Sequence, residues 1–272
     1  MTALIIFASV GGIALLLLLI YLLVLIRPVG AKKLPPQLLC DYAHRGLHGN
    51  GIPENSLAAF ELACRRGVGI ELDVQLSRDG CVMVFHDYTL NRMTDRDQKL
   101  SELTAEELSQ LRLADTDEKI PTLAQVLALV DGRVPLLVEL KGESTNTALC
   151  APVAELLKSY RGDYCVESFN PLLVGAMKKQ LPGVVGGLLY TNVCRDKKKR
   201  SALNLALTAM ALNVIARPNF IACNKADRNS LPVHLTTKLY RAPRFVWTVT
   251  SREELEEAHR LGEHPIFENC DP

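Results

Sequence analysis

The sequence predicts an α/β protein: a TIM-type (β/α)8 barrel preceded by one N-terminal transmembrane helix. Two observations predict this class. From Leu38 onward, short apolar segments with strand-like composition alternate with amphipathic helical patterns to the end of the 272-residue chain. Before that point, residues 3–26 include no charged side chain. Strand–helix alternation over this length is typical of a parallel sheet, which closes most simply into an eight-stranded barrel.

The uncharged N-terminal run is long enough for a membrane span, because at ~1.5 Å per residue it exceeds a hydrocarbon core of ~30 Å. A cleaved signal peptide is the main alternative, and a buried globular helix is another. The length of the run, the lack of a basic residue before it and the lack of a small-x-small cleavage site argue against a signal peptide. The basic residues Arg27, Lys32 and Lys33 follow the run directly. The positive-inside rule therefore predicts a single-pass protein with its C-terminal domain in the cytoplasm.

The predicted domains are residues 1–37, comprising the transmembrane helix (about 3–26) and a linker with prolines, and residues 38–272, comprising the barrel. The expected strands are Asp41–His44, Gly69–Val74, Val82–His86, Pro135–Lys141, Tyr164–Ser168, Val184–Tyr190, Phe220–Cys223, Phe245–Val249 and Pro265–Glu268. The expected helices are Asn55–Arg66, Pro121–Val130, Ala148–Tyr160, Pro171–Leu181, Ser201–Asn213 and Ser251–Leu261. Nine strands compete for eight barrel positions. The turn at 77–80 is too short for a parallel crossover, so one strand beside it belongs to a hairpin.

Residues 88–120 are expected to form an insertion. Thr104 and Glu107 make a capping-box pattern for a short helix there. The insertion follows His86 and Asp87 directly, so it either covers one side of a site or forms a solvated surface excursion.

Composition limits the classes of partner. The formal net charge is +1, from 31 basic and 30 acidic residues. A general nucleic-acid binder would be strongly basic, so no nucleic-acid partner is expected. The eight cysteines are scattered without a Cys-x-x-Cys pair, which suits a reducing compartment. A local basic run at 195–200 is either a membrane-contacting loop or a solvated loop.

Polar side chains interrupt several of the apolar strands. Glu71 and Asp73 are two residues apart, so a strand places both carboxylates on one face, and Glu139 and Lys141 repeat this spacing. Buried charge is costly unless it is paired or bound to a metal. Because active sites of such barrels lie at the carboxyl ends of the strands, Glu71, Asp73 and Glu139 are predicted to hold one hard divalent cation, Ca²⁺ or Mg²⁺. The alternative for any one pair is a polar strand edge or a salt bridge.

The remaining charged residues suit the cleavage of a phosphodiester. His44 and His86 end two strands and can divide the roles of general acid and general base, although each alone is more often structural. Arg45 and Lys141 are candidates for contacting phosphate oxygens. The pattern therefore predicts metal-assisted phosphodiester hydrolysis.

These residues, in this order, resemble the glycerophosphodiester phosphodiesterase family, in the form of a membrane-anchored bacterial-type member. The resemblance rests on an ordered set of motifs: His44-Arg45-Gly46, Pro53-Glu54-Asn55-Ser56-Leu57-Ala58-Ala59-Phe60, Glu71-Leu72-Asp73-Val74, Asp79-Gly80, Val84-Phe85-His86-Asp87, Pro121-Thr122-Leu123, Glu139-Leu140-Lys141, Ser168-Phe169 and Trp247-Thr248-Val249.

The resemblance implies hydrolysis of glycerophosphodiesters to an alcohol and sn-glycerol 3-phosphate. It assigns acid–base catalysis to His44 and His86, and the cation to Glu71, Asp73 and Glu139. It also implies that Arg45 and Lys141 contact phosphate, that Asn55 supports a ligand, and that Trp247 lines the pocket unless it is a core aromatic.

The late end of the chain departs from the family pattern. Thr250 stands where the family has Asn, and Phe267-Glu268-Asn269 replaces a Thr-Asp-x-Pro-like ending. Substrate choice is therefore open between soluble glycerophosphodiesters and lipid-derived or lysophospholipid substrates at the membrane. Two other functions remain as alternatives: cleavage of phospholipid head groups in the manner of sphingomyelinase D-like barrels, and a catalytically silent membrane-tethered binding module.

Overall fold

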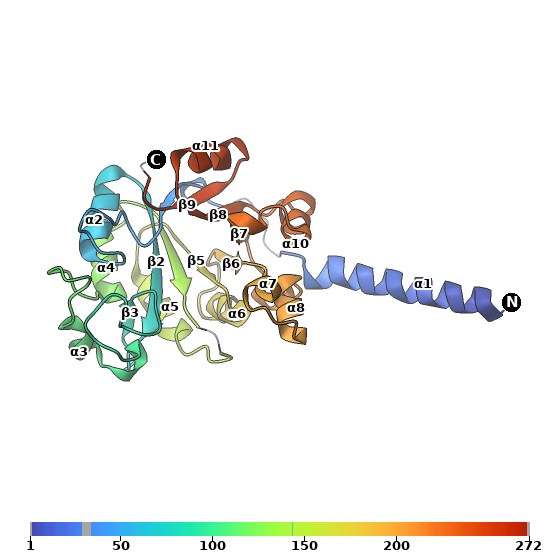
Figure 1. Cartoon of the computed structure of the whole chain (residues 1–272), viewed down its shortest axis with the longest axis horizontal. Coiled ribbons are helices and arrows are strands. Elements are labelled where there is room, and N and C mark those ends of the chain that lie inside the picture. Colours follow the sequence, from blue (N-terminus) through green and yellow to red (C-terminus); the bar gives the residue numbers. More distant parts are fainter. Residues whose placement is uncertain (1, 29–33, 143, 271–272) are drawn as a thin grey trace.

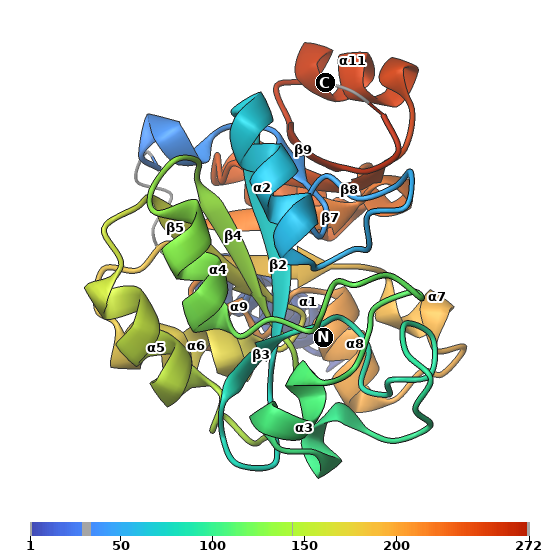
Figure 2. The same cartoon turned by 90° about the vertical axis from the view of Figure 1, so that its left-hand side faces the viewer.

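The eight-stranded parallel barrel is present. The computed structural model describes residues 2–28, 34–142 and 144–270. Its sheet has the strand order β1-β9-β8-β7-β6-β5-β4-β2-β3, and β1 also pairs with β2, which closes the barrel (Figure 2). The strands are β1 Tyr42–Ala43, β2 Gly69–Leu76, β3 Val82–Val84, β4 Leu136–Leu140, β5 Tyr164–Ser168, β6 Gly186–Tyr190, β7 Phe220–Asn224, β8 Arg244–Val249 and β9 His264–Phe267.

The surplus strand candidate is β3, which is antiparallel to β2 in a hairpin across the turn at 77–80. The other eight strands pair in parallel. The predicted hairpin is therefore confirmed, and β3 is the strand that stands outside the barrel wall.

Most helices lie on the outside of the barrel, whereas the N-terminal helix extends away from it (Figures 1 and 2). Those of the described chain are α1 Thr2–Ile20, α2 Leu57–Arg66, α3 Ala105–Ser109, α4 Leu123–Val130, α5 Cys150–Ser159, α6 Pro171–Gln180, α7 Val193–Asp196, α8 Ala202–Thr208, α9 Asn213–Ala216, α10 Leu231–His234 and α11 Arg252–Arg260, with short 3-10 or π turns at Tyr21–Leu25 (η1), Pro36–Leu38 (η2), Leu100–Glu102 (η3), Lys225–Asp227 (η4) and Leu235–Leu239 (η5). The single helix expected over 201–213 is wrong. α8 ends at Thr208 and α9 begins at Asn213, because Met210 adopts a left-handed conformation with φ 51°.

The barrel interior is layered. One apolar side chain from most strands fills its lower part, and together these residues form a buried cluster: Tyr42, Leu137, Cys165, Leu189, Phe220, Ala222, Phe245 and Ile266. The alternate residues of β2, Ile70, Leu72 and Val74, point outward into the cluster beneath the helices. Inward positions two residues further along each strand therefore lie above the apolar floor, at the carboxyl ends.

The insertion at 88–120 folds around its own small core rather than forming a solvated excursion. Met83 of β3 and Phe85 just after it pack against the buried side chains of the insertion, which are Leu90, Met93, Leu100, Leu108, Leu111, Leu113 and Ile120. The predicted capping box is confirmed, since Thr104 Oγ1 accepts from the Glu107 amide while the Glu107 side chain accepts from the Thr104 amide.

The predicted transmembrane helix is not supported, because no helix within the described residues is long and apolar enough to cross a membrane. The α-helix ends at Ile20, short of the predicted end at 26, and the chain continues as the π-helical turn η1. The last part of the expected span packs on the barrel instead. Tyr21 Oη donates to the Ala209 carbonyl at 2.9 Å, Tyr240 Oη donates to the Leu22 carbonyl, and Ile26 is fully buried. α1 itself extends away from the barrel (Figure 1). Lys32 and Lys33, on which the predicted orientation depends, lie outside the described residues.

Candidate active site

Two neighbouring strands, β2 and β4, bring the predicted metal ligands together. Pairing of β2 with β4 sets Asp73 opposite Glu139, and Glu71 precedes Asp73 on the same inward face. One carboxylate oxygen from each of Glu71, Asp73 and Glu139 lies within 4.8 Å of the others, and all three residues are buried. The convergence expected from their spacing is therefore present.

The three carboxyl groups experience different environments. Burial raises the pKa of Glu71 well above its usual value, and the neighbouring Asp73 and Glu139 add to this effect. Burial likewise raises the pKa of Glu139 to about 7. Burial opposes ionisation of Asp73 too, but Lys141, His86 and Arg45 together hold its pKa well below the usual range. Burial and the neighbouring carboxyl groups therefore oppose ionisation of Glu71 and Glu139, and the nearby cations favour the charged form of Asp73.

Two cations face these carboxylates. Lys141 Nζ lies 3.1 Å from both Asp73 Oδ1 and Glu139 Oε1. The backbone amide of Arg45 donates to Glu71 Oε2 at 2.8 Å, and the Arg45 guanidinium lies 3.6 Å from Asp73 Oδ2. Asn55, which the sequence analysis assigns to ligand support, donates from Nδ2 to Asp73 Oδ2 at 2.9 Å. Asp73 is thus fixed by three of the predicted site residues.

Sequence reasoning missed a fourth buried carboxylate, Glu167 on β5. It pairs in register with Glu139, is 1% exposed, and its Oε2 atom has no hydrogen-bond partner among the described residues. Burial raises its pKa well above the usual value, and Glu139 and Asp73 raise it further. Glu167 interrupts an apolar strand and stands two residues after the inward Cys165, and this pattern could have identified it from the sequence.

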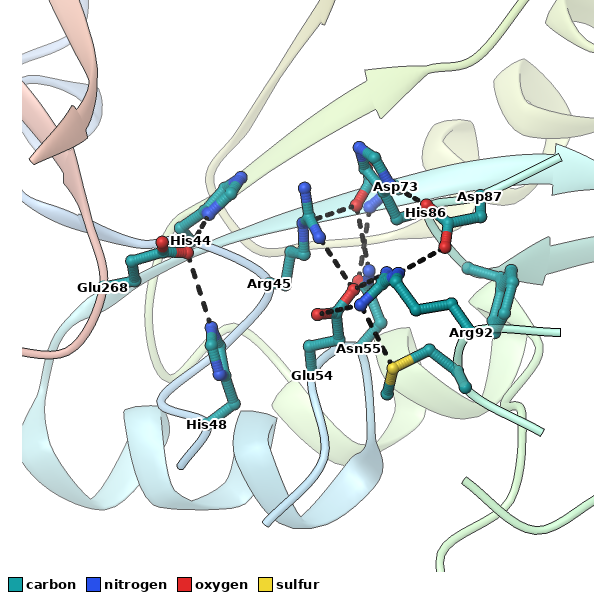
Figure 3. Close-up of polar contacts among 12 residues, drawn as sticks. His44, Arg45, His48, Glu54, Asn55, Asp73, His86, Asp87, Arg92 and Glu268 are labelled. Carbon is teal, nitrogen blue, oxygen red and sulfur yellow. Dashed lines mark hydrogen bonds and ion pairs between the residues drawn. The ribbon is translucent and has the colours of Figure 1, made fainter. Parts of the chain in front are cut away.

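His86 is held by a carboxylate that is itself held by an arginine (Figure 3). His86 Nδ1 lies 2.5 Å from Asp87 Oδ1, and Arg92 Nε donates to Asp87 Oδ2 at 2.5 Å. Arg92 comes from the insertion and also pairs with Glu54, which in turn pairs with Arg45. Burial lowers the pKa of His86; the negative charge of Asp73 acts to raise it, and the positive charges of Lys141 and Arg45 act to lower it.

His44 is held in the same way by a different residue. Its Nδ1 atom lies 2.7 Å from Glu268 Oε2, and His48 Nε2 lies 3.7 Å from the same oxygen (Figure 3). The two imidazoles, His44 first and His48 second, hold the pKa of the Glu268 carboxyl group well below its usual range. The sequence analysis assigned no role to Glu268 or His48. In both histidines, a carboxylate on Nδ1 leaves Nε2 as the ring nitrogen free to act.

Trp247 lies on the inward side of β8. Its indole Nε1 donates to the Ala222 carbonyl at 2.9 Å, and its ring meets Phe169 edge-on at 5.4 Å between centroids. Phe169 is 41% exposed, so this aromatic pair reaches from the interior to the surface. The position is compatible with the expected pocket wall.

The residues present fit a divalent metal ion. Their donors are carboxylate oxygens, which hard cations such as Ca²⁺ and Mg²⁺ prefer. If all were ionised, the four carboxylates Glu71, Asp73, Glu139 and Glu167 would exceed the two cations Lys141 and Arg45 by two negative charges. One divalent ion offsets that excess.

Comparison with known proteins agrees with this geometry. The profile of the Glycerophosphoryl diester phosphodiesterase family matches residues 44–269. A Bacillus subtilis relative named "Putative glycerophosphodiester phosphodiesterase YhdW" is 36% identical over 236 residues, covering 81% of this chain and 90% of the relative.

Two solved structures share the barrel. An Oleispira antarctica phosphodiesterase, solved in complex with the product sn-glycerol 3-phosphate, has a TM-score of 0.70 at 25% identity, covering 84% of this chain and 92% of its own. A glycerophosphodiester phosphodiesterase from Thermotoga maritima has a TM-score of 0.65 at 26% identity, covering 84% of this chain and 94% of its own. With a family match over most of its length and the site described above, the chain belongs to the glycerophosphoryl diester phosphodiesterase family and is an enzyme of that class.

Proposed function

We propose that this enzyme hydrolyses glycerophosphodiesters to an alcohol and sn-glycerol 3-phosphate with the help of one divalent cation, Ca²⁺ or Mg²⁺. The observation that carries the proposal is the placement of two carboxylate-held histidines beside a cluster of buried carboxylates. The product complex of the Oleispira antarctica relative supports the choice of product.

The proposed roles follow from the contacts. Glu71, Asp73 and Glu139 would hold the cation, which when bound supplies positive charge to the phosphate oxygens as the reaction proceeds. Asn55 fixes Asp73 in the orientation this requires. Arg45 and Lys141 add fixed positive charge for the phosphate, and Trp247 forms a wall of the substrate pocket.

His44 and His86 divide the proton transfers. One histidine takes the proton from the glycerol hydroxyl beside the phosphodiester as that oxygen attacks phosphorus. The other gives a proton to the departing alcohol oxygen, and the cyclic phosphate then formed is opened by water. Each histidine keeps Nε2 available because its Nδ1 is bound to a carboxylate.

The test uses the full-length protein stripped with EDTA, with Ca²⁺ and Mg²⁺ restored separately. Release of choline is followed from glycerophosphocholine, where the second product is glycerol 3-phosphate, and from lysophosphatidylcholine, where the second product is lysophosphatidate. We expect activity to disappear on chelation and to return with one of the two ions. A rate unaffected by chelation, with metal shown to be absent, would refute the metal-dependent mechanism.

Two substitutions test the assigned residues. His44→Ala and Glu71→Gln should each lower kcat by ~10²-fold or more. The matched controls are His259→Ala, in a histidine that pairs with Asp41 outside the site, and Glu61→Gln, in an arginine-paired surface carboxylate. Turnover of lysophosphatidylcholine to a lyso- or cyclic phosphatidate, with no glycerol 3-phosphate formed from glycerophosphocholine, would favour head-group cleavage of the sphingomyelinase D type.

A further inference from the structure

Each candidate catalytic histidine contacts a carboxylate through Nδ1, but the two carboxylates have different further partners. Asp87, behind His86, is tied to the permanently charged Arg92. Glu268, behind His44, instead has a second imidazole, His48, within 3.7 Å. The side chains of His44, His48 and Glu268 are only 16%, 17% and 25% exposed, so the group is largely sheltered from water.

The backbone fixes Glu268 beside His44. β1 and β9 pair in parallel, with Ala43 opposite Phe267, and the His44 amide donates to the Phe267 carbonyl at 2.8 Å. The Glu268 amide donates to the Val249 carbonyl at 2.9 Å. Because both residues directly follow a paired position, their contact is set by the closure of the barrel.

His48 reaches the same carboxylate through a tight loop. Arg45 and Gly46 both have positive φ, at 56° and 81°, and they turn the chain back after β1. The Leu47 amide then donates to the Ala59 carbonyl at 3.1 Å, which anchors the loop on α2. This loop brings His48 Nε2 toward Oε2 of Glu268, the same oxygen that His44 contacts.

We propose that Glu268 is the positioning residue of His44 in catalysis, and that His48, 3.7 Å from the same carboxylate oxygen, helps to hold Glu268 in place. The carboxylate accepts a hydrogen bond from the Nδ1–H group of His44. This bond directs Nε2 toward the substrate and stabilises the imidazolium that forms when Nε2 takes up a proton. The inference rests on the catalytic role proposed above for His44. It goes beyond that role by naming the group that sets the histidine's orientation and tautomer.

The test compares Glu268→Gln with the wild-type full-length protein, using glycerophosphocholine and the restoring metal ion. We expect kcat to fall by ~10–100-fold, with KM changed by less than about threefold, because general acid–base catalysis depends on the protonation site more than binding does. Glu268→Asp, which keeps the charge, should recover part of kcat, and His48→Ala should give a smaller loss than Glu268→Gln. The matched control is Asp41→Asn, which makes the same carboxylate-to-amide change beside His259.

A second readout does not depend on turnover. With ¹⁵N-labelled histidine, only six residues give imidazole signals, and His44→Gln assigns the one of interest. We expect the Nδ1–H tautomer in the wild-type protein and a loss of that preference in Glu268→Gln. Native kcat in Glu268→Gln, an equal loss in Asp41→Asn, or an unchanged tautomer would each overturn the proposal. A wild-type protein inactive on glycerophosphodiesters would instead refute the proposed function, and the ring-nitrogen signals would still decide whether Glu268 controls His44.

Discussion

Replacing Glu167 by glutamine tests the charge balance of the site most directly. The amide keeps the size of the side chain and removes its ability to ionise. In the metal-free protein, Glu167 lies beside Glu139 and Asp73 with one oxygen unpartnered in the described structure, so burial and like charge both oppose its ionisation. We therefore expect Glu167→Gln to stabilise the metal-free protein.

The magnitude is that of satisfying a buried polar group, roughly 1–3 kcal/mol, because the glutamine amide can donate toward the Glu139 or Asp73 carboxylates, which an ionised Glu167 repels. In a chain of this size, 1 kcal/mol changes Tm by about 2–4 °C, so we expect Tm to rise by roughly 2–12 °C at pH 8. The sign depends on pH. The pKa of Glu167 is raised in the folded protein, so above the unfolded value of about 4.3 the unfolded chain releases a proton that the folded chain retains. Wild-type stability from this group thus falls as pH rises, and the advantage of glutamine should shrink toward pH 4.

Metal binding should reverse the benefit. Once a divalent cation is present, the negative charge of Glu167 helps to balance it, and loss of such an outer partner typically costs about 10–100-fold in metal affinity. Calorimetric or fluorescence melting of the full-length protein, stripped and then titrated with Ca²⁺ or Mg²⁺, measures both effects.

The matched control is Glu263→Gln. Glu263 is also buried, at 3% exposure, but it forms ion pairs with Arg244 at 2.5 Å and Arg228 at 3.1 Å. Breaking a buried pair leaves charge uncompensated, so this variant should lose stability by roughly 3–5 kcal/mol. A Tm for metal-free Glu167→Gln at or below the wild-type value, or an unchanged metal affinity, would refute the charge-balance reasoning.

Three further predictions concern the same end of the barrel. Gly46→Ala should destabilise the protein by roughly 2–5 kcal/mol in thermal unfolding, because φ is +81° and the added Cβ would lie 2.9 Å from the Phe60 ring; an unchanged Tm would contradict this. Asp87→Asn should lower kcat by ~10–100-fold with little change in KM, since His86 would lose the carboxylate on Nδ1; steady-state kinetics within threefold of wild type would rule it out. Burial raises the pKa of Glu139 to about 7, so below that pH a metal ion must displace a proton to bind. Titration calorimetry at pH 8, 7 and 6 should show metal affinity falling by up to about tenfold per pH unit below pH 7. A metal affinity independent of pH would contradict the raised pKa of Glu139.

Much of the site follows from local sequence alone. Alternation along a strand places Glu71 and Asp73 on one face, and the rule that barrel sites lie at the carboxyl ends brings Glu139 to the same place. The hairpin at β3 likewise follows from a turn too short for a parallel crossover. The common face of Glu71 and Asp73 and the hairpin need only the spacing of residues within a few positions, whereas the place of Glu139 also needs the expected fold class.

The remaining contacts depend on pairing between distant segments. Glu268 contacts His44 only because the last strand pairs with the first. Glu167 lies beside the carboxylate cluster only because β5 pairs with β4 in the register that sets it opposite Glu139. At the N-terminus, apolar composition alone suggested a membrane span through residue 26, whereas Tyr21 and Ile26 are in contact with the barrel or buried. Composition cannot distinguish a segment that packs on its own domain from one that faces lipid.

The two-residue strand β1 joins both ends of the sheet, since it pairs with β2 on one side and β9 on the other. The pairing of this short strand with its two neighbours therefore closes the barrel and also orients a proposed catalytic histidine. A substitution in β9 can therefore change the orientation of His44, which follows β1, although the two segments are far apart in the sequence. Trimming the C-terminus before Glu268 would be expected to loosen the enclosure and disable the reaction together, so stability and turnover in this enzyme should be lost in parallel.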